Sequence, residues 1–465
     1  MRLNEYLDSL KGKTVAVIGI GVSNTPLIEL LLGYGISVTA CDKKERAAFG
    51  DLADRLEKWG CTLKLGEDYL KDLDQDVIFR SPGIRPDIAE FEAAKARGSK
   101  ITSEMEVFFD VCPCHMLAVT GSDGKTTTTT IISELLKAAG KTVYVGGNIG
   151  HPLLAEAGKM KEEDWAVLEL SSFQLLTMHK SPEIAVVTNL APNHLNVHKG
   201  MEEYVEAKAN VFLHQSAAQK VILNYDNEIT RAFARRAPGH VTFFSRKDAA
   251  HGDVILQDGT ISVKKENGIR PVLPVEDIAI PGVHNVENYM AAIAAVDGLV
   301  PDEVIRTVAA CFAGVEHRIE LVREVHGVKY YNDSIASSPT RTIAGLRSFR
   351  QKVILIAGGK DKDIPYDVLG PEIVAHVKFL VLTGGDVLGS TVPKICASVL
   401  NAPGYDSHAL PVLLIDDFEA AVRAAAQHAQ PGDVVLMSPA STSFDKFANF
   451  MERGKKFKDI VMTLD

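Results

Sequence analysis

The sequence predicts an α/β fold in three domains, and three observations lead to this prediction. Short apolar segments recur along the 465 residues, and segments with helical periodicity lie between many of them. Several apolar segments end in glycine or polar residues, as strands of a parallel sheet do where they lead into ligand-binding loops. A chain of this length is expected to form roughly three domains. We place them at residues 1–103, 104–314 and 315–465.

The first domain begins with an arrangement typical of Rossmann-like domains. The predicted strand Thr14–Ile18 leads into Gly19-Ile-Gly21 and a helical run, and the predicted strand Ser37–Ala40 is followed by Asp42. Strand, glycine turn, helix, strand and terminal acid form a nucleotide-binding βαβ unit. Asn24 stands where the dinucleotide fingerprint has its third glycine. NAD, the diphosphate of another nucleotide, and a turn that binds nothing are therefore all open interpretations.

The central domain carries a glycine-rich phosphate loop of the P-loop ATPase type. A predicted strand, Met116–Val119, and a predicted helix, Thr127–Ala139, flank the sequence Thr120-Gly-Ser-Asp-Gly-Lys-Thr126. Backbone N–H groups of such a loop and the helix N-terminus attract phosphate oxygens. Lys125 supplies a positive charge for the outer phosphates, and the Thr126 hydroxyl can bind Mg²⁺. An ordinary strand–turn–helix corner does not need this Lys-Thr pair.

Three polar residues after the next strands could carry chemistry in a mainly parallel central sheet. Glu169 ends a predicted strand and could hold Mg²⁺, or could be a surface or helix-capping acid. His194 could be a ligand or a structural histidine, and His198 competes for its role. Lys208 has the pattern of a lysine on a helix surface. The other predicted strands of this domain are 184–187, 221–223 and a hairpin region near 251–275 around Asp258-Gly259.

The third domain is predicted to be a second Rossmann-like domain. Its predicted strands are 328–331, 353–356, 379–382 and 434–436, and two of them lead into glycine-containing loops at 357–361 and 383–385. In the first domain, a predicted strand at 76–79 likewise leads into the loop Arg80-Ser-Pro-Gly83. Ligands of open α/β sheets gather at such strand ends.

Composition and charge argue against several classes of protein. The formal net charge is −10 with both signs interleaved, which argues against nucleic-acid binding. No apolar run approaches the roughly 20 residues needed to span a bilayer, and no signal-peptide core is present, so we expect a cytoplasmic protein without membrane insertion. Cys112 and Cys114 lack a second ligand pair at zinc-finger spacing, so we interpret them as buried or linker thiols in a reducing compartment.

The ordered set of motifs resembles the Mur ligase family of peptidoglycan synthesis over essentially the whole chain. Several of these motifs are nearest to the members that add D-glutamate to UDP-N-acetylmuramoyl-L-alanine. The resemblance is carried by Ser81-Pro-Gly-Ile84, the phosphate loop, Gly146-Gly-Asn-Ile-Gly150, Leu168-Glu-Leu-Ser-Ser-Phe173, His194, Tyr204–Lys208, Gly282–Asn288, Glu316-His-Arg318, Tyr331-Asn-Asp-Ser334 and Ser438–Asp445.

The resemblance implies an ATP- and Mg²⁺-dependent amide ligase, expected to be a monomer, that works through an acyl phosphate. It implies that ATP contacts Gly121, Ser122, Asp123, Gly124, Lys125, Thr126, Thr127, Asn288, Arg318 and Asp333. It implies that Lys125, Glu169, His194 and Lys208 are catalytic, and that Thr126, Glu169, His194 and a carbamoylated Lys208 hold two metal ions. It implies a UDP-substrate site at Val22, Ser23, Asp42, Ser81, Gly83 and Asn148, and a D-glutamate site at Lys362, Ser443 and Phe450.

Three departures from the family pattern concern local roles. Asp123 stands where asparagine is usual, Asn193 and Asn196 flank His194 where acids are common, and Ile335 stands where a lysine is frequent. The alternatives are another Mur ligase, a folylpolyglutamate synthase-like ligase, a nucleotide-binding protein without turnover, and, more remotely, an NAD oxidoreductase.

Overall fold

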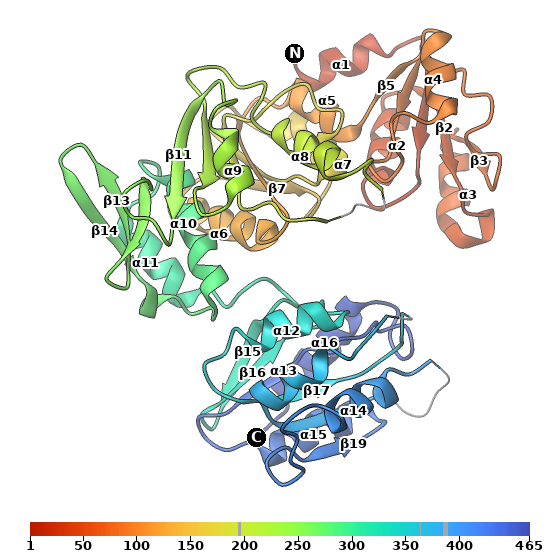
Figure 1. The fold of residues 1–465 in the computed structure, drawn as a ribbon. Helices are drawn as coiled ribbons and strands as arrows, with labels where there is room; N and C mark the ends of the chain where they lie inside the picture. Colours follow the sequence, from red (N-terminus) through yellow and green to blue (C-terminus); the bar gives the residue numbers. More distant parts are fainter. Residues whose placement is uncertain (194–196, 363, 385–388) are drawn as a thin grey trace. The chain divides into compact units, whose positions relative to one another are not determined.

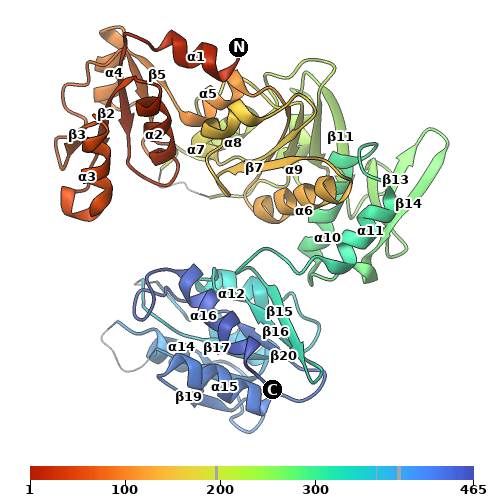
Figure 2. The ribbon, with the colours of Figure 1, turned by 180° about the vertical axis from the view of Figure 1, so that it is seen from behind.

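The computed structural model describes residues 1–193, 197–362, 364–384 and 389–465, and it confirms the α/β class (Figures 1 and 2). The chain divides into two compact units, residues 1–275 with 287–308 and residues 276–286 with 309–465. Three sheets fall within residues 14–102, 115–274 and 320–437. The domain boundaries given above remain predictions. In the described residues, no helix is both long and apolar enough to cross a membrane.

The first sheet is parallel and has the strand order of a doubly wound fold. The order is β3-β2-β1-β4-β5, with each neighbouring pair parallel. The strand order reverses between β1 and β4: from β1 the chain adds strands on one side, and from β4 it adds them on the other. The loops after β1 and β4 therefore lie beside each other, which is where open α/β sheets bind ligands. The strands are β1 (Thr14–Ile18), β2 (Ser37–Asp42), β3 (Thr62–Leu65), β4 (Val77–Phe79) and β5 (Lys100–Thr102). The surrounding helices are α1 (Leu3–Ser9), α2 (Thr25–Gly33), η1 (Arg46–Phe49), α3 (Asp51–Lys58) and α4 (Ala89–Ala96).

The second sheet is mainly parallel, as predicted, and ends in an antiparallel hairpin. Its order is β14-β13-β12-β11-β10-β9-β6-β8-β7. Asp258 and Gly259 both have positive φ (49° and 72°), as the predicted two-residue turn requires. The strands are β6 (His115–Thr120), β7 (Val143–Gly147), β8 (Trp165–Glu169), β9 (Ile184–Val187), β10 (Lys220–Asn224), β11 (His240–Ser245), β12 (Val254–Gln257), β13 (Thr260–Lys265) and β14 (Gly268–Pro274).

The helices that accompany the second sheet include those of the phosphate loop and of Lys208. They are α5 (Glu104–Val111), α6 (Lys125–Ala138), η2 (Leu154–Lys159), α7 (Ser172–Leu175), α8 (Met201–Ala209), α9 (Glu228–Phe233), η3 (Val275–Asp277), α10 (Val283–Val296) and α11 (Asp302–Cys311). The boundaries between the two compact units fall within η3, α10 and α11.

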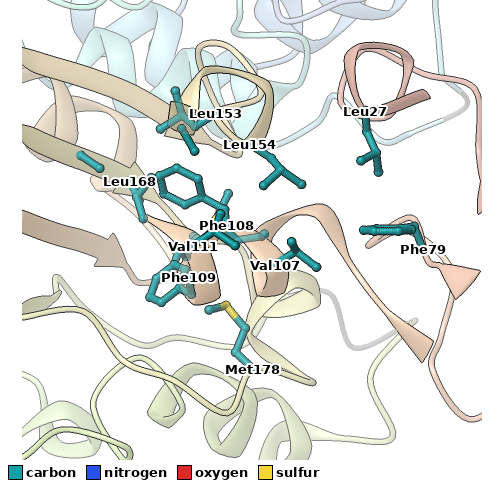
Figure 3. Close-up of a cluster of buried hydrophobic side chains, with 14 of the residues drawn as sticks. Leu27, Phe79, Val107, Phe108, Phe109, Val111, Leu153, Leu154, Leu168 and Met178 are labelled. Atoms are coloured by element: carbon teal, nitrogen blue, oxygen red, sulfur yellow. The ribbon is translucent and has the colours of Figure 1, made fainter. Parts of the chain in front are cut away.

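One hydrophobic core joins the first two sheets. Helix α5 contributes Val107, Phe108 and Phe109, all buried, and Figure 3 shows them between Leu27 and Phe79 of the first sheet's layer and side chains of the second. Full burial of such a side chain contributes roughly 1.5–3 kcal/mol. This shared core holds the loop after β4 and the loops of the second sheet within one compact unit. The side chains of the second layer drawn there include Leu153, Leu154, Leu168 and Met178.

The third sheet is covered by helices on both faces. Its order is β15-β16-β20-β17-β18-β19, and only the edge strand β15 is antiparallel to its neighbour. Along β17, Val353 and Leu355 belong to one buried cluster while Ile354 and Ile356 belong to the other, as the two-residue period of a strand dictates. The strands are β15 (Glu320–Val325), β16 (Val328–Asn332), β17 (Val353–Ala357), β18 (Val377–Leu382), β19 (Val412–Leu414) and β20 (Val434–Met437), and the helices are α12 (Pro339–Leu346), α13 (Leu369–His376), α14 (Val392–Leu400), α15 (Phe418–His428) and α16 (Phe450–Met462).

Candidate active site

The phosphate loop connects β6 to α6 in the first compact unit. Helix α6 begins at Lys125, two residues before the predicted start, because Gly124 adopts a left-handed conformation (φ 78°) and turns the chain into the helix. A Cβ atom at Gly121 would clash with the Thr188 hydroxyl, and one at Gly124 would clash with the Asn288 amide oxygen. Both glycines are therefore required by close packing of the loop against its neighbours, and not only by turn formation.

The segment after β9 holds the loop in shape. The Ser122 N–H donates to the Asn189 carbonyl (2.8 Å), the Asp123 N–H donates to Asn189 Oδ1 (3.0 Å), and the Thr188 hydroxyl donates to the Asp123 carbonyl (2.6 Å). The first N–H groups of α6 have no partner within the helix and attract anions. Thr188 and Asn189 were visible in the sequence only as a strand end, so their supporting role was missed.

Lys125 and the threonines after it lie at the start of α6. Lys125 Nζ donates to the carbonyls of Gly121 and Ser122, both at 3.0 Å, so its charge lies directly over the loop. Thr126 is half-buried and Thr127 is buried, while Asp123 is exposed. The loop thus combines a fixed positive charge with a helix N-terminus, an arrangement that suits a polyphosphate.

Glu169 lies at the C-terminal end of β8 and is 1% exposed, which excludes the surface interpretation. Asn148 Nδ2 donates to its Oε1 atom (2.7 Å), whereas its Oε2 atom is buried and has no hydrogen-bond partner among the described residues. Burial of a carboxylate oxygen without a partner is unfavourable unless the oxygen binds a cation or accepts a hydrogen bond. Glu169 therefore fits the hard, oxygen-binding Mg²⁺ ion predicted for this position.

Lys208 is also 1% exposed, so the interpretation as a helix-surface lysine is wrong. It lies near the end of α8 and its Nζ atom donates to the Thr120 hydroxyl (3.1 Å), one residue before the phosphate loop. Burial lowers the pKa of Lys208 well below its ordinary value, and the charge of Lys125 lowers it further. Lys208 is thus a buried amine beside the loop, with a reduced tendency to carry a proton.

His194 and Asn196 lie outside the described residues. The competing histidine, His198, is buried and stacks on the Phe173 ring (5.2 Å between centroids). Its ring nitrogens contact the Ser172 hydroxyl (2.9 Å) and the Glu203 carboxylate (3.2 Å). Burial lowers the pKa of His198. Both ring nitrogens already have protein partners, so this histidine has a supporting role in the described site.

The remaining residues predicted to contact ATP are divided between the two units. Asn288 belongs to the first unit and is buried, and its Oδ1 atom accepts a hydrogen bond from Thr128 of α6 (3.2 Å). Arg318 and Asp333 belong to the second unit. Two residues that flank Arg318, His317 and Ile319, have left-handed φ values of 64° and 44°, and such strain in residues other than glycine is concentrated at functional sites.

Asp333 follows β16 and is 4% exposed. The Ser438 hydroxyl donates to its Oδ2 atom (2.7 Å), and the Ile319 N–H donates to its Oδ1 atom (3.3 Å). Burial raises the pKa of Asp333 to about 7. The carboxylate is therefore held in position by two hydrogen-bond donors.

The residues predicted to bind the UDP substrate lie mostly at the C-terminal edge of the first sheet. Asp42 accepts the N–H groups of Ile20 (2.7 Å) and Lys44 (2.9 Å), so it shapes the glycine turn. Asn24, in place of the third glycine, donates to the carbonyls of Ile18 and Gly19. Val22 and Ser23 are exposed on this turn, while Ser81 and Gly83 lie on the loop after β4, and Asn148 contacts Glu169 instead of this edge.

The residues predicted to hold D-glutamate are in the second unit. Lys362 is exposed and its Nζ atom donates to the Ser337 hydroxyl (3.2 Å). Ser443 is buried, and Phe450 begins α16 with its ring against His317 (6.0 Å between centroids). A buried residue that the sequence did not reveal, Arg453, donates to the backbone carbonyls of Ser334, Ser441 and Thr442 and so ties these loops together.

Comparison with known proteins gives two domain matches and many relatives. Residues 119–296 match the Mur ligase middle domain, and residues 317–441 match the Mur ligase glutamate ligase domain. The UDP-N-acetylmuramoylalanine–D-glutamate ligase of Acetivibrio thermocellus is 52% identical, over 100% of this chain and 99% of that protein. The enzymes of the same name from Ruminiclostridium cellulolyticum and Clostridium beijerinckii are each 48% identical, over 99% of their own length and 100% and 99% of this chain respectively.

Solved structures show the same fold at low sequence identity. A UDP-N-acetylmuramoyl-L-alanyl-D-glutamate–2,6-diaminopimelate ligase is 20% identical with a TM-score of 0.59, covering 85% of this chain and 94% of that one. MurF from Acinetobacter baumannii is 17% identical with a TM-score of 0.59, covering 91% of each chain. At this identity, the similarity establishes the fold alone.

Proposed function

Because this chain belongs to the Mur ligase family, we propose that it joins D-glutamate to UDP-N-acetylmuramoyl-L-alanine in an ATP-dependent reaction of peptidoglycan synthesis. The observation that carries the proposal is full-length similarity to ligases of this specificity, at 52% and 48% identity. The buried Glu169 and Lys208 beside an intact phosphate loop support turnover and argue against a nucleotide-binding protein that does no chemistry.

The reaction must convert a carboxylate, which is a poor electrophile, into an amide. We propose that the carboxylate of the L-alanyl group attacks the γ-phosphorus of ATP, ADP leaves, and an acyl phosphate forms. The amine of D-glutamate then attacks the acyl carbon, and inorganic phosphate leaves as the C–O bond breaks. Negative charge develops on phosphate oxygens in both steps, so fixed positive groups at the loop lower the barrier.

The residues of the first unit would bind ATP and hold its phosphates. In this proposal Lys125 leaves the carbonyls of Gly121 and Ser122 and pairs with phosphate oxygens, while the N–H groups of the loop and of the start of α6 bind the rest. Thr126 and Glu169 would hold one Mg²⁺, and Lys208, as a carbamate, would help His194 to hold a second. Bound Mg²⁺ would neutralise phosphate charge and orient the γ-phosphate.

The other substrates would bind at the first and third predicted domains. We propose that the glycine turn after β1 and the loop 81–83 bind the UDP substrate, through Val22, Ser23, Asp42, Ser81 and Gly83, with Asn148 nearer the reacting end. Asn288, Arg318 and Asp333 would complete the ATP site. Lys362, Ser443 and Phe450 would hold D-glutamate. We further propose that the enzyme is a cytoplasmic monomer, as checked by light scattering and cell fractionation.

Phosphate release tests the proposal directly. The purified protein is incubated with ATP, Mg²⁺ and UDP-N-acetylmuramoyl-L-alanine, and each of a panel of D- and L-amino acids is added in turn. We expect phosphate release only with D-glutamate, together with a product heavier than the UDP substrate by one glutamyl residue. Turnover with L-lysine or diaminopimelate on a UDP-dipeptide, or with L-glutamate on a folate, would assign a sister ligase instead. Tight binding of NAD with no response to the UDP substrate would overturn the assignment of the first domain.

A further inference from the structure

Two loops of the first unit that are far apart in the sequence are joined by one arginine. The Arg85 guanidinium lies just after the loop 81–84 and forms two hydrogen bonds with the Glu203 carboxylate, of 2.9 and 2.8 Å. It also donates to the carbonyl of Val197 (2.7 Å). Its remaining side is occupied by Asp87, at 2.8 Å from Nε. The segment 85–87 is therefore bonded to both ends of the segment 197–203.

The partners of Arg85 form a partly buried network, which distinguishes them from an ordinary surface ion pair. The Arg85 and Glu203 side chains are only 23% and 22% exposed. Glu203 also accepts the N–H of Lys199 (2.8 Å) and contacts His198 Nδ1 (3.2 Å), and Lys199 pairs with Asp87. The Arg85 hydrogen bonds lower the pKa of Glu203 to about 2. Two-point arginine–carboxylate pairs fix orientation more strongly than single contacts do.

Each end of this network leads to a different part of the proposed site. On one side, the buried Arg80 donates to the carbonyl of Ile84 (2.6 Å) and to Thr177, so the loop that carries Ser81 and Gly83 is held along its length. On the other side, Glu203 lies in the first turn of α8, and Lys208 follows five residues later on the same helix, about one and a half turns away.

We propose that Arg85 and Glu203 are positioning residues that couple the loop of the UDP substrate to the helix that carries Lys208. Neither side chain needs to touch a substrate. The pair fixes the start of α8 relative to the loop 81–84, so a ligand that orders this loop also restricts the segment 197–208. Binding of the UDP substrate then prepares the metal-binding side of the site. That the ligands are the UDP substrate and Mg²⁺ rests on the proposed function. The link between the loop 81–84 and helix α8 rests on the contacts alone.

Helix α8 offers a matched control for this proposal. Arg236 makes the same kind of two-point contact with Glu206, at 2.6 and 2.7 Å, three residues further along the helix. That pair joins α8 to the region after α9 and has no contact with the loop 81–87 among the described residues. Arg85→Ala and Arg236→Ala therefore each remove a two-point arginine–carboxylate pair from one helix, although the Arg236 pair is more exposed, at 39% and 51%. Arg85→Lys keeps the charge but loses the two-point geometry, and serves if Arg85→Ala folds poorly.

Hydrogen–deuterium exchange, read by mass spectrometry, tests the link without relying on activity. In the ligand-free protein, Arg85→Ala is expected to speed exchange in both 80–87 and 197–208, whereas Arg236→Ala leaves 80–87 unchanged. With UDP-N-acetylmuramoyl-L-alanine added, wild type is expected to gain protection from exchange in both segments. Arg85→Ala and Arg85→Lys are expected to gain protection only in 80–87. In turnover assays, the Mg²⁺ concentration for half-maximal rate should rise on the order of tenfold in Arg85→Ala, as coupling within one network implies.

Two results would overturn the coupling. Protection of 197–208 by the UDP substrate in Arg85→Ala, equal to that of wild type, would show that the pair transmits nothing. Equal effects of Arg85→Ala and Arg236→Ala on exchange and on the Mg²⁺ requirement would reduce both pairs to general stabilisers of α8. If wild type instead shows no protection of 80–87 by the UDP substrate, the proposed function fails at this site, and the ligand-free exchange still decides whether Arg85 links the two segments.

Discussion

Lys208 Nζ lies 3.1 Å from Thr120 Oγ1, at the last residue of the strand that enters the phosphate loop. The Thr120 hydroxyl in turn donates to the carbonyl of Leu170, the residue after Glu169 (2.7 Å). The Thr120 hydroxyl therefore connects Lys208 to the C-terminal ends of two neighbouring strands, β6 and β8. Burial and the nearby charge of Lys125 lower the pKa of Lys208, so at a given pH more of this lysine is a neutral amine than would be the case for an exposed lysine.

The first prediction is that Lys208 carries a carbamate. A neutral amine adds CO₂ and becomes an anion that can bind a hard cation, which an ammonium cannot do. With ¹³C-bicarbonate we expect one carbamate resonance that disappears in Lys208→Ala, and this variant should be nearly inactive, with partial recovery by short carboxylic acids. Lys220 is the control because burial also lowers its pKa and its Nζ atom bonds to a carbonyl away from the loop. A resonance that survives in Lys208→Ala and is lost in Lys220→Ala would contradict the assignment.

The second prediction concerns Lys125. In the structure its Nζ atom donates to two loop carbonyls. In the reaction this positive charge would stabilise the negative charge that develops on the phosphates. Lys125→Ala should lower kcat by roughly 10²-fold or more, with little change in the thermal midpoint. Lys137→Ala, on the same helix, removes only an exposed pair with Glu134 and should leave kcat unaltered. Single-turnover rates of Lys125→Ala close to those of wild type would remove this loop from the chemistry.

The sequence was sufficient for the fold class, the phosphate loop and most strands, because these depend on local patterns. Apolar runs such as Ile184–Val187 and the Asp258-Gly259 turn signal their structure directly. Six strands were not predicted: β3, β5, β7, β11, β15 and β19, all but β11 at the edge of a sheet. Their residues are half-buried or exposed at most positions, so their apolar pattern is weak. Burial of Lys208 was not predictable either, because its environment includes residues far away in the sequence, such as Thr120, 88 positions earlier.

The support of the site also depends on contacts that no local pattern encodes. Asn189 fixes the phosphate loop from 66 positions away, and Arg85 reaches Glu203 across 118 positions. Asn148 was predicted to contact the UDP substrate from its motif, and its hydrogen bond to Glu169 became visible only in three dimensions. The residues proposed to carry the chemistry were named from motifs, whereas the residues that hold them in place were found only in the structure.

The third prediction is a pH-dependent stability change in Asp333→Asn. Burial raises the pKa of Asp333 to about 7, while an unfolded chain has an aspartate pKa of about 3.9. Between these values the folded state binds more protons than the unfolded state, so this group lowers stability as pH rises through the window. The free energy of unfolding of the variant should therefore be higher than that of wild type by on the order of 1–3 kcal/mol at pH 8. This difference should shrink towards pH 4.

The same variant should lose activity, because the proposed ATP contact needs the charge. Ser438 can reverse its hydrogen bond to accept from the new amide, so folding should not be harmed. Glu372→Gln is the control of opposite sign: hydrogen bonds from Arg347 lower the pKa of Glu372, so its contribution is present at neutral pH and is lost as pH falls. Chemical denaturation between pH 4 and pH 8 measures both. A gain in Asp333→Asn that is independent of pH would contradict the burial argument.

The fourth prediction is that Lys362 recognises a carboxylate of D-glutamate. Its ammonium group is exposed and bonded only weakly, at 3.2 Å to the Ser337 hydroxyl, so it can turn to a ligand at small cost. Ile335 offers no charge where the family often has a lysine, and Lys362 should therefore carry more of the recognition. Lys362→Ala should raise the KM for D-glutamate by roughly tenfold or more, the effect of a lost hydrogen bond to a charged group, and should change the KM for ATP little.

Lys378 provides the comparison for Lys362 within the same unit. It pairs with Asp433 at 2.7 Å and lies at the start of β18, the end of the strand opposite to its C-terminal loop. Lys378→Ala should leave both KM values unchanged. Ile335→Lys should be tolerated, and in the Lys362→Ala background it should recover part of the affinity for D-glutamate if the two positions face one ligand. An unaltered KM for D-glutamate in Lys362→Ala would contradict this role and move recognition to Ser443 and the start of α16 at Phe450.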